Sequence, residues 1–343
     1  MKNLPFRVVA SSVDPFDNAY VLTIAVPTFK RPALLEETLR SVAALKFAVP
    51  VEVIVLDNDP DGDDVQAVEL MRNVITGPYR YYRNIENVGM FGNWNQCIFQ
   101  ARGKYITILH DDDLLCAQFG PAVDKLLSQG KLKHEIVGFH VGMLEQRPDR
   151  TNAQAALPSA EQVKSFPAAV HETLSVKLFS INDLFFANLF CGTLAVIFNR
   201  EHAIDLGGFR VEWAPIADYE FWCRWADCYG DIPFANWSVA QYRIGQNESM
   251  KLDIRTAFVV KSHEMRRHLI DGGAVPGLFA SLLGIVTFAQ RSQIYRDWRT
   301  AEEPPLSLVT KVAMRVSGKT LQSAAKVSKA LGLTGSRTRT ATQ

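Results

Sequence analysis

Three almost unbroken apolar runs, separated by stretches with helical spacing, constrain the fold of this chain more than any other feature. The runs cover residues 21–26, 51–56 and 105–109, and such runs are typical of strands buried on both faces of a sheet. Between the first two runs, Pro32 opens a predicted helix with Leu34, Leu35, Leu39 and Val42 on its apolar side, and residues 63–73 and 91–101, between the second and third runs, also carry apolar side chains at helical spacing. Alternating strands and helices predict an α/β fold, with a mostly parallel, Rossmann-like central sheet and helices on both of its faces.

The rest of the chain is less regular. Residues 1–20 are expected to be an irregular lead-in, and residues 145–169, which lack any period, a long loop. Further predicted elements are strands over 79–83, 135–140, 194–198 and 237–243, and helices over 120–129, 174–190, 201–206 and 216–229. We predict one large domain over residues 1–250 and a C-terminal helical extension over residues 251–343.

Overall composition is typical of a globular cytoplasmic protein. The chain has 343 residues and a formal net charge of +1, which argues against a general nucleic-acid binder. Its five cysteines are dispersed without zinc-ligand spacing, so we expect reduced, buried thiols. We expect no signal peptide, because residues 1–18 lack an apolar core, and the longest apolar run, residues 275–289, is too short and interrupted to predict a helix that spans a bilayer.

Three of the predicted strands are followed, where each strand ends, by residues typical of a ligand site. They are Pro27 and Thr28, then Asp57 and Asn58, and finally three consecutive carboxylates, Asp111 to Asp113. Right-handed crossovers bring the carboxyl ends of parallel strands to one edge of the sheet, and ligands bind along that edge. We therefore expect these three groups to converge on one site.

The Asp triplet predicts a cation site. Three adjacent negative charges repel one another strongly in a partly desolvated place, so a positive group should share the site. Carboxylate oxygens at this edge suit Mg²⁺ or Mn²⁺ carrying a phosphate-containing ligand. The alternative is a solvated acidic turn.

An ordered set of motifs resembles an inverting glycosyltransferase of family 2, with the GT-A fold and of the bacterial surface-polysaccharide type. The motifs are Val-Pro-Thr-Phe-Lys-Arg at residues 26–31, Val-Leu-Asp-Asn at 55–58, Asn87-x-Gly89, Asn95, Leu-His-Asp-Asp-Asp at 109–113, and Gly-Gly-Phe at 207–209 leading to Asp218. They extend over about two-thirds of the chain.

The resemblance implies a nucleotide-sugar donor site. Pro27, Thr28 and Phe29 would line the nucleotide pocket, and Asp57 would bind the nucleobase. The Asp triplet matches the DXD region, with Asp111 and Asp113 as the favoured metal ligands, although the sequence does not divide the roles. The donor-binding residues so implied are Pro27, Thr28, Phe29, Arg31, Asp57, Asn58, Asn87, Gly89, Asn95, Asp111 and Asp112.

Asp218 falls where the family places its general base, which deprotonates the acceptor hydroxyl. The alternative is a helix N-cap. Two positions depart from the family pattern. Ala217 replaces a Glu, for which Glu220 or Glu212 would have to substitute, and Trp94 replaces an Arg. Trp94 cannot bind phosphate as that Arg would, so Arg31, Arg83 and Arg243 are the candidates for this contact. His110 is either a metal ligand or a residue that hydrogen-bonds to one.

The resemblance implies transfer of a sugar from a UDP-, GDP- or dTDP-linked donor to a glycan or undecaprenyl-diphosphate-linked acceptor, as in O-antigen or capsule synthesis. The apolar, aromatic segment 174–213 would select the acceptor. Residues 304–343 hold seven Lys and Arg and no Asp or Glu, which suits peripheral binding to an anionic membrane surface, a solvated helix or a disordered tail. The alternatives are a nucleotidyltransferase that forms nucleotide sugars and a non-catalytic nucleotide- or carbohydrate-binding module.

Overall fold

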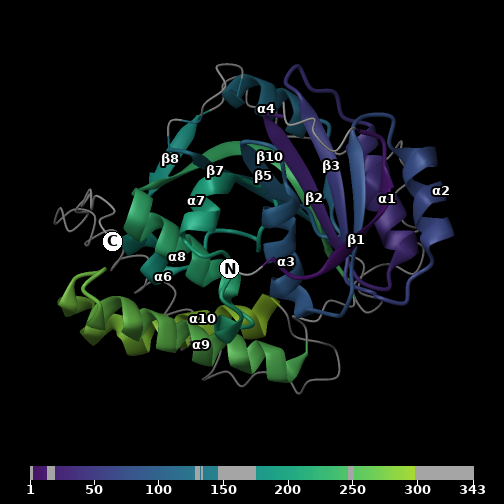
Figure 1. Ribbon diagram of the computed structural model, residues 1–343. Coiled ribbons are helices and arrows are strands. Elements are labelled where there is room, and N and C mark those ends of the chain that lie inside the picture. Colours follow the sequence, from purple (N-terminus) through teal and green to yellow (C-terminus); the bar gives the residue numbers. More distant parts are fainter. Residues whose placement is uncertain are drawn as a thin grey trace.

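The computed structural model is built around one large twisted sheet with helices on both faces (Figure 1). It describes residues 3–13, 20–127, 132, 134–145, 175–245 and 251–297. The strand order is β1-β4-β3-β2-β5-β9-β7-β10-β6, and β8 pairs with β10 beside this path. The predicted α/β fold with a C-terminal helical region is therefore confirmed.

The first half of the sheet is parallel and contains the predicted apolar runs. Its strands are β2 (Leu22–Thr28), β3 (Val51–Asp57), β4 (Tyr79–Asn84) and β5 (Tyr105–Ile108). Every residue of β2 is buried because side chains alternate between two covered faces. Leu22 and Ile24 pack in one core with α1, α2 and α4, and Ala25 packs in the other with α3 and α8.

The second half of the sheet is mixed. It contains β6 (Leu114–Leu115), β7 (Ile136–Glu145), β8 (Val176–Phe179), β9 (Val196–Asn199) and β10 (Ile232–Ile244). β9 pairs antiparallel with both β5 and β7, whereas β7 and β10 are parallel. Parallel order is therefore confined to the β4-β3-β2-β5 block and to the β7-β10 pair.

Helices begin where the sequence gives local signals. Pro32 is the first residue of α1 (Pro32–Ala43), and Asp63 accepts hydrogen bonds from Val65 N and Gln66 N at the start of α2 (Asp64–Val74). Among the residues that the structure describes before position 245, the other helices are α3 (Gly89–Gln100), α4 (Phe119–Leu127), α6 (Ile181–Phe186), α7 (Arg200–Asp205), the short η1 (Val211–Trp213) and α8 (Ala217–Tyr229).

Two predictions of secondary structure are wrong. The lead-in contains a strand, β1 (Phe6–Ser11), which pairs antiparallel with β4. Residues 174–190 are not one helix, because 176–179 form β8 against β10 and only Ile181–Phe186 is helical, after an N-capping Ser180. Pairing with a distant strand overrides local helical preference in that segment.

The C-terminal helices pack against the sheet domain. They are α9 (Leu252–Asp271), η3 (Gly277–Leu282) and α10 (Leu283–Asp297), and they lie beneath α6 and α8 in Figure 1. Met265 of α9 lies in the core that contains α8, and Phe279 contacts the rings of Phe185 and Phe186. The predicted basic tail and all but the first residue of the predicted loop 145–169 lie outside the described residues.

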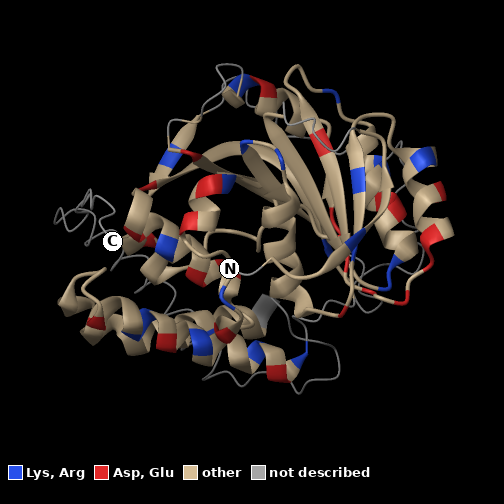
Figure 2. Ribbon diagram, in the orientation of Figure 1, with Lys and Arg blue, Asp and Glu red and all other residues tan. Residues whose placement is uncertain are grey.

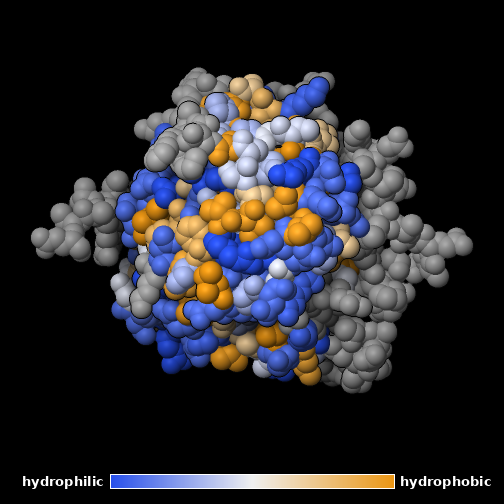
Figure 3. All heavy atoms as spheres, turned by 45° about the vertical axis from the view of Figure 1, so that its right-hand side comes forward, coloured by the Kyte–Doolittle hydropathy of each residue, from blue (hydrophilic) through white to orange (hydrophobic). Residues whose placement is uncertain are grey.

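The surface and the cysteines bear on two further predictions. Within the ranges described, we find no helix that combines the length and the hydropathy required to cross a bilayer. On the face shown in Figure 3, hydrophobic residues gather across the middle and hydrophilic ones surround them. The five cysteines are free, as expected, and Cys97, Cys116 and Cys223 are buried, but Cys228 is exposed at the end of α8, so its predicted burial is wrong.

Candidate functional site

The ends of β2, β3 and β5 meet at one edge of the sheet, as predicted. Thr28 Oγ1 donates to Asp111 Oδ2 at 2.8 Å, and Asn58 N donates to Thr28 O at 2.9 Å. Residues from three separate stretches of chain are thus in direct contact. The convergence of Thr28, Asn58 and the Asp triplet is confirmed by these contacts.

Asp111 is buried and fixed by its neighbours. Its carboxylate accepts hydrogen bonds from Thr28 and, at 3.4 Å, from Phe29 N. Burial, with a smaller effect of the Asp112 charge, raises the pKa of Asp111 to about 6, although the hydrogen bond from Thr28 opposes this shift. Thr38 Oγ1 of α1 donates to the main-chain oxygens of Asp111 and Asp113 at 2.9 and 2.8 Å, which anchors the turn.

Arg31 supplies the positive charge that the triplet requires. Its Nη1 lies 2.9 Å from Asp112 Oδ2 and 3.5 Å from Asp111 Oδ1. The side chain remains 36% exposed, so the guanidinium is accessible to a ligand as well. Phe29, two residues earlier, is 41% exposed, whereas Pro27 is buried within β2. Of the predicted nucleotide-pocket residues, Phe29 is therefore the one that presents an open ring.

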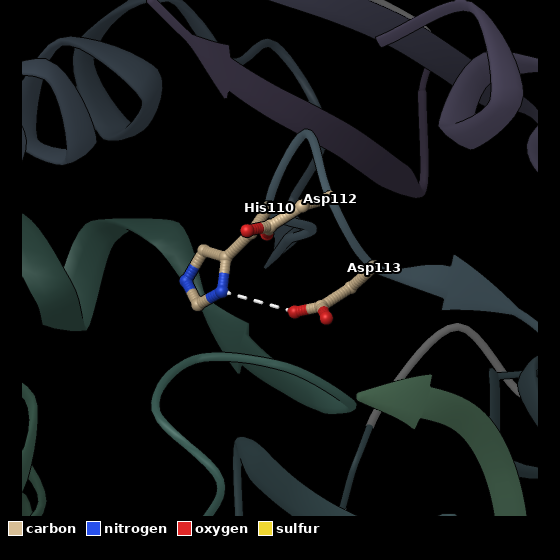
Figure 4. Close-up of side chains that lie close together, drawn as sticks. All are labelled: His110, Asp112 and Asp113. Carbon is tan, nitrogen blue, oxygen red and sulfur yellow. Dashed lines mark hydrogen bonds and ion pairs between the residues drawn. The ribbon is translucent and has the colours of Figure 1, made fainter. Parts of the chain in front are cut away.

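His110, Asp112 and Asp113 form the group that could hold a metal ion (Figure 4). One ligand atom from each lies within 4.8 Å of the others, and His110 Nδ1 is 3.1 Å from Asp113 Oδ2. Carboxylates are the ligands preferred by Mg²⁺ and Mn²⁺, so this donor set fits the predicted cation. The structure thus brings Asp112 and Asp113 together with His110, while Asp111 faces Thr28 and Arg31. The assignment of Asp111 and Asp113 as ligands stays a prediction.

His110 is held from three sides. Its Nε2 lies 3.0 Å from Thr193 Oγ1, and its ring stacks on Trp94 at 5.0 Å between centroids and 17° between planes. Burial lowers the pKa of His110, but the hydrogen bond to Asp113 and the charges of the three aspartates outweigh it and raise the pKa. Trp94, a departure from the family pattern, therefore positions the imidazole beside the acidic triplet.

Asp57 is buried and already bound to neighbouring side chains. Its Oδ2 accepts hydrogen bonds from Tyr81 at 2.9 Å and from Arg83 Nη2 at 2.8 Å, and its Oδ1 accepts one from Asp59 N at 2.9 Å. Arg83 is buried as well and also pairs with Asp64. The predicted nucleobase contact of Asp57 stays a prediction. A ligand would reach this carboxylate within the existing hydrogen-bond network. The sequence analysis did not identify Tyr81 as a member of that network.

Asn58, Asn87 and Gly89 shape the loop before α3. Asn58 Nδ2 donates to Asn87 Oδ1 at 2.8 Å, and Asn58 Oδ1 accepts from Asn84 Nδ2 and Val88 N, each at 3.0 Å. Gly89 has φ +72°, a conformation that favours glycine, and donates to Asn87 Oδ1 at 2.9 Å. These polar groups organise the loop, and their predicted contact with the donor stays a prediction.

Asn95 binds the main chain of a distant segment. Its Nδ2 donates to Phe209 O and its Oδ1 accepts from Phe209 N, both at 2.8 Å. The ring of Phe209 also contacts Trp94, with centroids 5.3 Å apart. Asn95 thus fixes the Gly-Gly-Phe segment that leads to Asp218, and its predicted role in donor binding stays a prediction.

Asp218 is a buried carboxylate near the acidic triplet. It is the second residue of α8, whose N-cap position is occupied by Ile216, so the alternative of an N-cap is wrong. Burial raises the pKa of Asp218 to about 6, against hydrogen bonds from main-chain N–H groups and Asn188 and against the nearby charge of His110. Burial raises the pKa of Cys191, and the charges of Asp113 and Asp218 raise it further, so both carboxylates act on one small region.

Glu220 and Glu212, the candidates to replace the family's Glu at position 217, are not placed for that role. Glu220 is bound by Arg224, at 2.8 Å, and by Arg210, at 3.4 Å, and Glu212 is exposed on η1. Of the arginines considered for phosphate binding, Arg83 is bound to Asp57 and Asp64, and Arg243 Nη1 donates to Glu37 at 2.8 Å. Arg31 is the one that combines contact with the triplet and exposure.

Comparisons with known proteins agree with this arrangement. Residues 23–137 match the model of Glycosyl transferase family 2. A Campylobacter jejuni protein named GalNAc(5)-diNAcBac-PP-undecaprenol beta-1,3-glucosyltransferase is 36% identical over 95 residues, which is 27% of this chain and 30% of that protein. An uncharacterized protein of Mycobacterium tuberculosis is 25% identical over 213 residues, and the chain spans 61% of its length.

Solved structures share the fold. A mannosyltransferase from Pyrobaculum calidifontis, in complex with GDP-Man and Mn²⁺, has a TM-score of 0.53 and 16% identity over 93% of this chain and 90% of that chain. At this identity the likeness shows a common fold alone. The match of residues 23–137 to the Glycosyl transferase family 2 model agrees with the resemblance read from the motifs.

Proposed function

We propose that the chain is an inverting glycosyltransferase that moves a sugar from a nucleotide-sugar donor to a hydroxyl of a glycan acceptor. One observation carries the proposal. Asp218 is a buried acidic residue with a pKa of about 6, and it lies close enough to His110, which forms a group with Asp112 and Asp113, for the charge of His110 to act on its carboxylate. A displacement with inversion requires these two parts, a leaving-group site and a separate base.

The donor would bind at the edge formed by β2, β3 and β5. The exposed ring of Phe29 offers a surface for the nucleobase, and Arg31 offers a guanidinium for the diphosphate. His110, Asp112 and Asp113 would hold Mg²⁺ or Mn²⁺, which offsets the negative charge of the departing nucleoside diphosphate. Binding of the diphosphate would draw Arg31 away from Asp112. The carboxylates of Asp112 and Asp113 would then both be available to the cation when the substrate binds.

The acceptor would react at Asp218. Its carboxylate takes the proton of the attacking hydroxyl, and a pKa of about 6 leaves it ionised at neutral pH yet more basic than an ordinary Asp. The main-chain hydrogen bonds and Asn188 hold this carboxylate in place. A single displacement then inverts the anomeric configuration.

The relatives suggest the class of substrates. The Campylobacter protein carries an undecaprenol-linked glycan in its name, and the Pyrobaculum structure holds GDP-Man and Mn²⁺. We propose a UDP-, GDP- or dTDP-linked donor, a lipid-linked glycan acceptor and a place in surface polysaccharide synthesis. Such an acceptor would bring the protein to the inner face of the cytoplasmic membrane.

The substitution Asp218→Asn tests the proposal. It should abolish sugar transfer while leaving Mn²⁺-dependent binding of UDP or GDP unchanged, because the donor site stays intact. Asp227→Asn, on the same helix, is the matched control and should transfer normally. Retained transfer in Asp218→Asn would exclude the assigned base. Release of pyrophosphate from a nucleoside triphosphate would instead indicate a nucleotidyltransferase, and binding without any turnover of donor a binding module.

A further inference from the structure

A hollow of about 650 Å³ opens beside the C-terminal helices, apart from the acidic triplet. Trp213 of η1 lines one side, and α9 lines the other with His263, Glu264, Arg267, His268 and Asp271. This volume lies in the range of sites that enclose a small ligand. None of these residues takes part in the donor site or in the base assignment. We call it the Trp213 hollow.

The lining combines an aromatic face with groups that both donate and accept hydrogen bonds. Trp213 is half-buried, and the ring of His268 stands 6.2 Å from it at 57°. His263 Nδ1 lies 2.9 Å from Thr287 Oγ1, and its Nε2 lies 3.4 Å from Arg267 Nη2. Burial and the charges of Arg267 and Arg266 lower the pKa of His263, so this imidazole is neutral at physiological pH.

The charges in the hollow are nearly balanced. Glu264 and Asp271 line the hollow together with one guanidinium, Arg267, and two imidazoles. Lys261 Nζ lies 2.9 Å from Glu264 Oε2 and 5.8 Å from the centre of the Trp213 ring, so a second positive charge borders the hollow. Along α9, positive and negative residues are interspersed (Figure 2). The two carboxylates disfavour an anionic ligand, and Arg267 with the neighbouring Lys261 disfavours a cation. An uncharged molecule rich in hydroxyl groups fits best, because the carboxylates and Arg267 can bond its hydroxyls while its C–H face packs on the indole.

The hollow lies within reach of Asp218 along the chain. Trp213 precedes Asp218 by five residues, a stretch that spans at most about 17 Å when fully extended. The stretch is tighter than that, because Ile216 N donates to Trp213 O at 2.8 Å. A second hollow of about 750 Å³, lined by Ala214, Leu252 and Lys261, shares Val260 with the first. The two hollows therefore adjoin and offer room for more than one ring.

We propose that the Trp213 hollow binds an uncharged sugar unit of the acceptor glycan, at a distance from the hydroxyl that reacts at Asp218. This inference rests on the proposed function and makes it more specific. Trp213 supplies the stacking surface, and Glu264, Asp271 and Arg267 bond the hydroxyls. The hollow thus selects a neutral saccharide and positions it relative to the base.

Binding of neutral sugars to the full chain tests the inference without turnover. The probes are chitotriose and maltotriose, with a sulfated trisaccharide as the anionic comparison, and saturation-transfer NMR reads binding in the absence of donor. At least one neutral probe should bind the wild type in preference to the sulfated one. Trp213→Ala should weaken that binding about tenfold, Trp213→Phe less, and Glu264→Gln by several fold.

Val211→Ala is the matched control, because Val211 is exposed on the same turn but does not line the hollow. It should bind as the wild type does, which separates loss of the hollow from disorder of the turn. Equal binding by the wild type and Trp213→Ala, a preference for the sulfated probe, or binding of neither neutral probe would overturn the inference.

The two proposals fail in different ways. Binding of a neutral probe should persist in Asp218→Asn, because the base does not line the hollow. If Asp218→Asn still transfers sugar, the assigned base is wrong, whatever the NMR shows. If Asp218→Asn is inactive and Trp213→Ala leaves both acceptor KM and probe binding unchanged, only the assignment of the hollow is wrong.

Discussion

Arg266 of α9 donates a hydrogen bond to Tyr219, the residue next to Asp218, at 3.3 Å between Nη2 and Oη. The guanidinium is fully buried and also donates to Phe185 O at 2.7 Å and to Gln290 Oε1 at 2.6 Å. One side chain of the C-terminal region therefore joins α6, α8 and α10. The predicted extension is part of the framework that holds the proposed base.

Replacing Arg266 with Met should destabilise the fold and slow transfer. The change leaves the buried Phe185 O and Tyr219 Oη and the half-buried Gln290 Oε1 without their charged donor, so we expect a loss of about 3 kcal/mol in the free energy of unfolding. Because α8 loses a support, kcat should fall while the donor KM changes little. Urea unfolding and steady-state kinetics measure the two effects. Arg291→Met, on the exposed side of α10, serves as the control and should change neither quantity.

Activity should fall as the pH drops through about 6. Asp218 accepts a proton only when ionised, and burial raises its pKa to about 6, so lower pH converts it to the inactive acid. Asp111, with a pKa also raised to about 6, adds a second protonation that weakens the donor site. The profile of kcat/KM should therefore decline by tenfold or more per pH unit below about pH 5.5. A rate that stays constant down to about pH 5 would contradict the assigned base.

Asp218→Asn should make the protein more stable near neutral pH. The folded state raises the pKa of Asp218 from 3.8 to about 6, so the native form binds the proton more tightly than the unfolded chain does. The resulting stability is complete below pH 3.8 and is lost as the pH rises through about 6. Removing the charge should recover up to about 3 kcal/mol at about pH 7.5 and little at about pH 4. Thermal unfolding of both forms at the two pH values measures this difference.

Asn95→Ala should loosen the Gly-Gly-Phe segment. The substitution leaves Phe209 N and O without their side-chain partners, which costs about 2 kcal/mol in the free energy of unfolding. Asn95→Asp keeps only the acceptor and should give an intermediate value. Gln100→Ala, at the end of the same helix, should be nearly neutral. If Asn95→Ala were as stable as the wild type, the two bonds would not hold this segment.

Mn²⁺ binding should depend most on Asp113. This carboxylate is fully buried and is fixed by His110 and by Arg243 N at 2.9 Å. Calorimetric titration of UDP or GDP with Mn²⁺ should show no metal-dependent binding in Asp113→Asn and an affinity at least about tenfold weaker in Asp112→Asn. Glu36→Gln, on the exposed face of α1, is the control. If metal affinity survived in Asp113→Asn but vanished in Asp111→Asn, the metal site would instead be assigned to Asp111, beside Thr28.

The parallel half of the fold could be predicted because each of its strands is indicated by its own residues. Each buried strand is a continuous apolar run, and right-handed crossovers then require Thr28, Asn58 and Asp111 to share an edge. The partners of the site residues carry no such signal. Asp57 lies opposite Arg83 because β3 and β4 are neighbours in register, and no local pattern specifies which strand lies beside which.

For the same reason, the sequence did not predict that β9 pairs antiparallel with β5 and β7. This pairing brings the Thr193 side chain to His110 across 83 positions of sequence, and neither residue is unusual in its own segment. Residues 176–179 were expected in a helix because the segment 174–190 is strongly apolar, but three of the four are exposed, and the strand gains its hydrogen bonds from β10. Burial and pairing, rather than composition, decide such segments.

The two ends of the sheet bear on how this protein behaves in a crowded solution. At one end, β1 has six residues with an irregular register between Val8 and Ala10, and at the other, β6 has only two residues. An irregular or very short border strand is a poor template for strands from other molecules, so each end resists aggregation. Without residues 1–11, the regular and fully buried β4 would become the border, and a chain shortened in this way should aggregate through its open row of peptide groups.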